Sequence, residues 1–229
     1  MRVLYLHGFA SSANSSKATF LTNRFQEQGI QMRTPDLNRP DFSTLTVSRM
    51  LQQTDEAIDE MPDEPLVVIG SSLGGFVAIQ AAARRPERIH RLVLLAPAID
   101  FGGTRMRELG SSGLEDWKRA GRINVFHYGY GRMMPIHYEL YEDASHYSAW
   151  DVDLLQPVTV FQGRRDQSVD PAIVEAWAHE RRNVELQMLD DDHQLAASLP
   201  FIWSTLRTTL ELGEVERPAL TSKSRDSRR

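Results

Sequence analysis

The chain has 229 residues and no cysteine, which excludes disulfides, thiolate metal sites and a cysteine nucleophile. Its formal net charge is -5, with hydrophobic residues at 41% and charged residues at 25%; this is ordinary for a globular protein and favours neither nucleic acid nor an anionic membrane as a partner. A chain of this length buries on the order of 70% of its unfolded surface, so it needs no metal or disulfide to fold.

Short apolar runs along the chain predict strands that are buried on both faces. Most are bounded by glycine or proline, and the strongest are rich in β-branched residues and leucine, which is typical of a parallel sheet. In chain order they lie at residues 3–6, 30–34, 65–70, 91–97, 157–163 and 184–189.

Helical patterns alternate with these runs. The helices are indicated by apolar residues at helical spacing, by capping residues, and by a glycine or proline that follows. The predicted helices lie at residues 17–28, 47–61, 73–84, 170–177 and 196–212. The alternation predicts an α/β fold, in which a mostly parallel sheet of about six strands carries helices on both faces.

The segment from about residue 100 to 150 interrupts this alternation. It is rich in aromatic residues and methionine, and it is too long to be a plain loop. We expect a helical cap insertion that packs its own aromatic residues and covers the functional site. Residues 213–229 hold few apolar residues and end in basic ones, so we expect a disordered tail behind a single domain at residues 1–212.

The first residues resemble no targeting signal. Met1 and Arg2 run straight into the apolar stretch at residues 3–6, which is far too short for a signal peptide or a membrane span. Together with the absence of cysteine, this favours a cytoplasmic location without a membrane span.

A candidate nucleophile lies between the predicted strand at 65–70 and the helix at 73–84. Residues 70–74 read GSSLG, the pattern G-x-S-x-G, in the strand-to-helix context that this pattern requires. Such a turn lifts the hydroxyl of Ser72 out of the sheet and points helix N–H groups at the position where negative charge develops. Ser71 is the local rival, but only Ser72 occupies the centre of the pattern.

A serine hydroxyl needs a base near neutral pH. Among seven histidines, His193 follows the last predicted strand and precedes the last helix, at the sheet edge expected to carry Ser72. The acid that orients this base should follow a strand and precede His193, and Asp166 fits. Asp170 is the rival, although its position before Pro171 suits a helix N-cap.

The loop after the first predicted strand offers a donor for an oxyanion. Gly8 permits a tight turn, so that the N–H of Phe9 can point at the reacting oxygen, and the N–H of Leu73 would be the second donor. His7 is expected to be structural. The polar residues that follow could line the mouth of the site or form a flexible polar loop: Ser11, Ser12, Asn14, Ser15, Ser16 and Lys17.

These segments together resemble the α/β-hydrolase superfamily: LHGF at 6–9, GSSLGG at 70–75, GRRD at 163–166 and DH at 192–193. The opening YLHGFASS with SKA, and the segment IGSSLGG, also resemble small bacterial esterases of the YqiA type. The resemblance implies hydrolysis of a small-molecule carboxylic ester or thioester without a cofactor or metal, by a Ser72–His193–Asp166 triad. Peptide, lactone or carbon–carbon bond hydrolysis on the same triad stays open, as does a non-catalytic ligand-binding protein.

Overall fold

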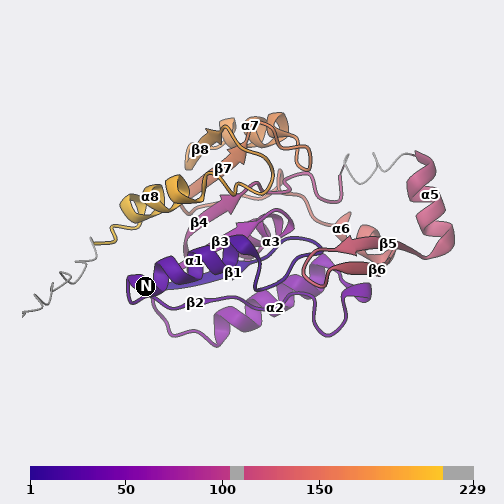
Figure 1. Ribbon diagram of the computed structural model, residues 1–229, viewed down its shortest axis with the longest axis horizontal. Coiled ribbons are helices and arrows are strands. Elements are labelled where there is room, and N and C mark those ends of the chain that lie inside the picture. Colours follow the sequence, from indigo (N-terminus) through magenta and orange to yellow (C-terminus); the bar gives the residue numbers. More distant parts are fainter. Residues whose placement is uncertain (104–110, 214–229) are drawn as a thin grey trace, which may run out of the picture.

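The computed structural model describes residues 1–103 and 111–213, which are built around a six-stranded sheet (Figure 1). The strand order is β2-β1-β3-β4-β7-β8 and every pairing is parallel, as predicted. The strands are β1 (Arg2–Leu6), β2 (Met32–Arg33), β3 (Leu66–Ser71), β4 (Ile89–Leu95), β7 (Val158–Gly163) and β8 (Val184–Leu189). All six expected apolar runs therefore form strands, although β2 is only 2 residues long.

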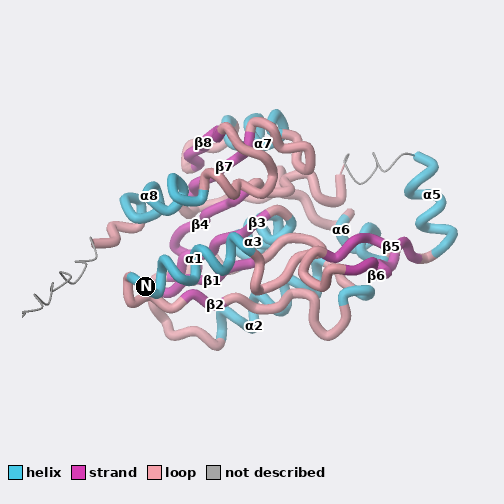
Figure 2. The backbone as a smooth tube through the Cα atoms, in the orientation of Figure 1, coloured by secondary structure: helices cyan, strands magenta, loops and turns pink. Residues whose placement is uncertain are grey.

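Helices cover both faces of the sheet, as Figures 1 and 2 show. Helices α1 (Ser16–Glu27) and α8 (Leu199–Thr209) pack on one face, and α2 (Val47–Asp59), α3 (Leu73–Arg84) and α7 (Pro171–His179) on the other. Because successive strand residues point to opposite faces, Val3 and Tyr5 lie in the core with α1 and α8, whereas Leu4 and Leu6 lie in the core with α2 and α3. The sheet thus has two apolar cores, one on each side.

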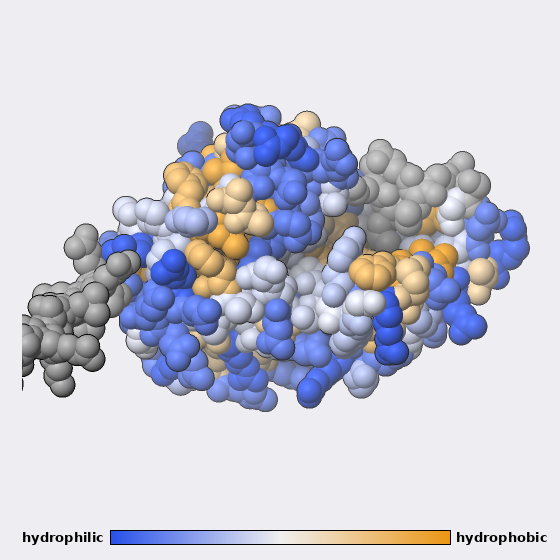
Figure 3. All heavy atoms as spheres, in the orientation of Figure 1, coloured by the Kyte–Doolittle hydropathy of each residue, from blue (hydrophilic) through white to orange (hydrophobic). Residues whose placement is uncertain are grey.

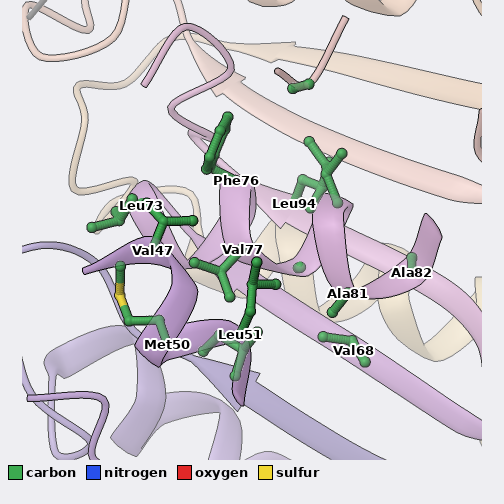
Figure 4. Close-up of a cluster of buried hydrophobic side chains, with 14 of the residues drawn as sticks. Val47, Met50, Leu51, Val68, Leu73, Phe76, Val77, Ala81, Ala82 and Leu94 are labelled. Carbon is green, nitrogen blue, oxygen red and sulfur yellow. The ribbon is translucent and has the colours of Figure 1, made fainter. Parts of the chain in front are cut away.

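Helix α3 is enclosed by other elements over most of its length. In Figure 4 the side chains of Val47, Met50 and Leu51 on α2 lie beside Leu73 and Val77 on α3. The first residue of α3 is Leu73, so this packing fixes the helix end that adjoins Ser72. None of the helices within residues 1–103 and 111–213 is both long and apolar enough to span a bilayer.

The insert leaves the sheet after β4 and returns at β7, and it holds more than helices. It contains α5 (Ser111–Ala120), β5 (Arg122–His127), β6 (Arg132–His137) and α6 (Glu139–Ala144). Strands β5 and β6 pair as an antiparallel hairpin, which the expectation of a helical insert missed. The sequence does carry a sign of this hairpin: residues alternate along β5, where Ile123 and Val125 face the core between exposed neighbours. Figure 1 shows these elements at the end of the molecule opposite the N-terminus.

Two segments about which the sequence made a prediction lie wholly or partly outside the residues that the structure describes. Residues 104–110, inside the insert, are not described. The expected tail at 213–229 also lies outside the described residues, apart from Gly213.

Candidate active site

Ser72 forms the turn between β3 and α3 by itself. Its backbone has φ 53° and ψ -119°, a strained conformation of the kind that persists where the surroundings enforce it. The two glycines of the G-x-S-x-G pattern make room for this turn: a Cβ on Gly70 would overlap the Gly74 carbonyl oxygen, and a Cβ on Gly74 would overlap that of Leu6. Ser71, by contrast, is a buried residue of β3, in register with Leu95 of β4.

The backbone of Ser72 is held on both sides. Its N–H donates to the Leu95 carbonyl at 3.0 Å, and its own carbonyl accepts from the N–H groups of Gly75 at 2.9 Å and Ala98 at 3.0 Å. The side chain is therefore presented from a fixed main chain at the carboxyl end of β3.

Asp166 and His193 form a hydrogen-bonded pair. Asp166 Oδ2 accepts from His193 Nδ1 at 2.8 Å and from Gln162 Nε2 at 3.0 Å, while Oδ1 accepts from the N–H groups of Ser168 and Val169 at 2.7 and 2.8 Å. Burial alone would raise the pKa of Asp166, but the hydrogen bonds from His193, Val169 and Gln162 outweigh it and hold this pKa below its ordinary value. An ionised Asp166 makes Nδ1 of His193 the donor and leaves Nε2 as the proton-accepting nitrogen.

The rival acid has another role in the structure. Asp170 is exposed and caps α7, where its Oδ1 accepts from the Ala172 N–H at 2.9 Å. Asp166, not Asp170, is the carboxylate that the fold brings to His193.

Ser72 and the Asp166–His193 pair lie at the same edge of the sheet. Ser72 follows β3, Asp166 follows β7 and His193 follows β8, and these strands run parallel, so their carboxyl ends share one edge. Within the described residues no hydrogen bond joins the Ser72 hydroxyl to His193. Such contacts are often long before substrate binds and shorten in the reacting complex.

The loop after β1 runs beside the nucleophile turn. A Cβ on Gly8 would lie 3.1 Å from the Cβ of Ser72 and 3.2 Å from the Ser71 carbonyl oxygen. His7 holds this loop as a structural residue: Nδ1 donates to the Gly8 carbonyl at 2.9 Å, and Nε2 accepts from the Leu37 N–H at 3.0 Å. The backbone that carries Phe9 therefore lies beside Ser72 and the first turn of α3, where a Cβ on Gly74 would overlap the carbonyl oxygens of Leu6 and His7.

The tip of the β5–β6 hairpin is bound to that loop. The N–H of Tyr128 donates to the Ala10 carbonyl at 2.8 Å. The ring of Phe42 lies 5.4 Å from that of Phe9 and 4.6 Å from that of buried His127. The insert thus reaches the loop next to Ser72.

The apolar side chains of the insert divide into two groups. Several pack against the core, among them Trp117, Ile136, Met134, Tyr138, Tyr141, Tyr147 and Trp150. Others are exposed: Phe126 and Met133, which pair across β5 and β6 where Figure 3 shows an apolar surface, and Tyr128 and Tyr130 in the turn between the two strands. Aromatic residues pack on each other in both groups, as expected: Trp117 on Tyr138 at 5.6 Å between ring centroids, and exposed Phe126 on Tyr128 at 5.2 Å.

Two polar residues of the site were not assigned from the sequence. Gln162, the penultimate residue of β7, is fully buried and donates to Asp166. Lys17, at the start of α1, donates from Nζ to the main-chain carbonyl of His193 at 3.1 Å. Among the described residues, no group of three or more His, Cys, Asp or Glu side chains is placed to hold a metal ion.

The parallel sheet with helices on both faces and a serine at the strand-to-helix turn is the α/β-hydrolase fold. The chain belongs to the Uncharacterised protein family (UPF0227), whose model matches residues 2–207. This confirms the resemblance to the α/β-hydrolase superfamily and to its YqiA-type branch.

Solved structures show the same fold at low sequence identity. Alpha/beta hydrolase domain-containing protein 10 from mouse superposes with a TM-score of 0.78 at 21% identity, covering 91% of this chain and 89% of that one. A monoacylglycerol lipase from Paleococcus ferrophilus superposes with a TM-score of 0.71 at 16% identity, covering 91% and 93%.

Sequence relatives match only part of their own length. Lipase LipV of Mycobacterium tuberculosis is 34% identical over 112 residues, which cover 47% of this chain and 41% of the lipase. The mitochondrial palmitoyl-protein thioesterase ABHD10 of Mus musculus is 25% identical over 187 residues, covering 73% of this chain and 59% of the thioesterase. The chain therefore spans between 41% and 59% of the length of these two relatives.

Proposed function

We propose that this protein is a serine hydrolase that cleaves a carboxylic ester or thioester through an acyl-enzyme, with Ser72 as nucleophile, His193 as base and Asp166 as the orienting acid. The observation that carries the proposal is the 2.8 Å hydrogen bond between Asp166 and His193, at the sheet edge where the strained Ser72 turn lies. Relatives named as a lipase and a palmitoyl-protein thioesterase support the ester or thioester class.

The reaction would run in two acyl-transfer steps. Nε2 of His193 takes the hydroxyl proton as Ser72 attacks the carbonyl carbon, and the N–H groups of Phe9 and Leu73 hold the oxyanion. The carbon–oxygen or carbon–sulfur bond then breaks, and His193 returns the proton to the leaving alcohol or thiol. Water, deprotonated by the same histidine, attacks the acyl carbon; the bond to Ser72 Oγ breaks, His193 returns the proton to this oxygen, and the acid is released. Asp166 fixes the tautomer and stabilises the imidazolium that forms in each step.

In this proposal residues 1–212 act as one domain, and the insert at about 100–150 is a cap whose inner face supplies the acyl-binding wall. The bond from Tyr128 to Ala10 supports this, because it joins the hairpin to the loop that carries Phe9. The proposed location is the cytoplasm, which the absence of cysteine fits at least as well as a secreted setting.

A fluorophosphonate probe combined with a substrate panel tests the proposal. We expect a single adduct on Ser72 and turnover of p-nitrophenyl esters, acyl-CoA thioesters or both. Labelling together with turnover only of peptides, lactones or carbon–carbon substrates would keep the triad and reject the ester class. No labelling and no turnover would favour a ligand-binding protein without chemistry.

Selectivity for acyl length is expected to rise until the cap pocket is full. Each buried methylene contributes about 0.8 kcal/mol, or roughly fourfold in affinity. We therefore expect kcat/KM to increase over the first members of a p-nitrophenyl ester series from acetate to decanoate. Met134→Ala should flatten this increase, since Met134 packs inward against the core.

Met133→Ala is the matched control, because the neighbouring Met133 is 56% exposed on the opposite face of β6. This variant should keep the wild-type profile. A steady fall in activity from acetate onward, unchanged in Met134→Ala, would contradict the cap pocket and leave the triad untouched.

A further inference from the structure

Lys17 is a buried lysine beneath the loop that carries His193. It is the second residue of α1, whose N-terminus is capped by Ser15, and it is only 8% exposed. Its Nζ donates to the main-chain carbonyl of His193 at 3.1 Å, across 176 residues of sequence. A lysine is almost never buried without a specific partner, because removing its charge from water is costly.

The same loop is held by carboxylate contacts of its own. Asp191 Oδ1 accepts from the Asp192 N–H at 2.8 Å, and Oδ2 accepts from the Ser198 N–H at 2.9 Å. The Asp191 carbonyl accepts from the N–H of Arg165 at 3.0 Å. These bonds fix the two ends of the loop, whereas Lys17 holds the residue in the middle, His193 itself.

The charges around Lys17 are those of the candidate site. Asp166 after β7, and Asp191 and Asp192 after β8, attract its ammonium. Burial nevertheless lowers the pKa of Lys17 to about 8, so the side chain is a cation at neutral pH and loses its charge in mildly alkaline solution. Tyr5 of β1 lies in the same core, and burial raises its pKa to about 12, so this phenol stays neutral throughout.

We propose that Lys17 is a positioning residue of the Asp166–His193 pair, which holds the His193 main chain and supplies a buried positive charge beneath it. This inference rests on the proposed function. Lys17 acts through His193: its ammonium meets the carbonyl of that residue, while the imidazole binds Asp166.

The sign of the electrostatic effect follows from Coulomb's law. A cation near the imidazole disfavours its protonated form, which cannot act as a base. Without the cation, the Asp166 carboxylate that binds Nδ1 would act on the imidazole unopposed and favour its protonated form. Loss of the charge should therefore move the acid limb of the activity profile toward higher pH.

The test compares Lys17→Met, Lys17→Arg and the control Arg24→Met, which removes a cation from the exposed side of the same helix. For each, kcat and KM for a p-nitrophenyl ester are measured from pH 5 to 10, together with thermal unfolding. In Lys17→Met we expect kcat to fall about ten- to a hundredfold through misplacement of His193. The acid limb should move to higher pH while KM stays near its wild-type value.

Thermal stability separates positioning from a structural role. Since the folded protein lowers the pKa of Lys17, its buried charge is not stabilising in itself, and Lys17→Met loses only the hydrogen bond to the His193 carbonyl, so we expect the melting temperature to fall by no more than about 2–4 °C. Lys17→Arg keeps a cation over the whole range and should restore the wild-type acid limb. Arg24→Met should leave kcat and the profile unchanged.

The outcomes distinguish this inference from the function on which it rests. A wild-type acid limb in Lys17→Met would overturn the positioning role, whatever happens to kcat. Failure of fluorophosphonate to label Ser72 in the wild type would instead overturn the proposed function, and the role of Lys17 with it.

Discussion

Ser72→Ala is expected to abolish fluorophosphonate labelling and to lower turnover by about a million-fold, the loss found when the nucleophile of a serine protease triad is removed. The reason is that no other hydroxyl shares its position: Ser72 is the single residue between β3 and α3, and its backbone conformation is set by contacts on both sides. Intact-mass measurement of the adduct and kcat/KM on the best ester of the panel check the two parts of this expectation.

Ser71→Ala is the matched control. Ser71 is a buried strand residue, so its hydroxyl does not share the presentation of Ser72 at the strand-to-helix turn. This variant should label normally and keep activity, apart from any loss of stability. An adduct on Ser71, or near-normal turnover in Ser72→Ala, would show that the nucleophile is assigned wrongly.

The sheet could be predicted because its strands are buried on both faces. In the sequence such strands appear as continuous apolar runs, and all six predicted runs form strands. Their order across the sheet was not predicted, because pairing depends on which helices cross which face. The weakest run, at residues 30–34, forms only Met32–Arg33, the edge strand beside β1.

The hairpin in the insert was missed for a different reason. One face of β5 and β6 is exposed and carries Phe126 and Met133, so aromatic residues and methionine occur where a half-buried strand usually has polar residues. The alternation of apolar and polar residues is therefore hard to recognise, and the sequence instead favoured a packed aromatic subdomain.

The residues proposed for chemistry could be found because each lies in the loop or turn just after a strand, Ser72 directly after β3 and Asp166 and His193 a few residues after β7 and β8. Residues at the carboxyl ends of parallel strands meet at one edge whatever the order of the strands, and this brings Asp166 to His193. Lys17 could not be found in this way, since it lies on a helix and meets its partner 176 residues later. From the sequence it was only one member of a polar stretch at residues 11–17.

Asp166 is the most completely hydrogen-bonded carboxylate at the candidate site. It receives bonds from Gln162, Ser168, Val169 and His193, and its side chain is fully buried. An amide at this position has only one accepting oxygen and an NH₂ group that cannot accept from Nδ1 of the imidazole. Replacing the carboxylate by an amide would therefore leave His193 free to adopt the other tautomer, with Nε2 protonated and unable to take a proton from the nucleophile.

Asp166→Asn is accordingly expected to lower kcat by about ten-thousand-fold, the effect of the same change in a serine protease triad. Asp170→Asn is the matched control, since Asp170 only caps α7 and asparagine is an equally favoured N-cap. This variant should keep wild-type kcat and lose well under about 1 kcal/mol of unfolding free energy. Steady-state kinetics and urea unfolding on both proteins give the comparison. If Asp170→Asn loses activity and Asp166→Asn retains it, the carboxylate that binds His193 in the structure is not the one that orients the base.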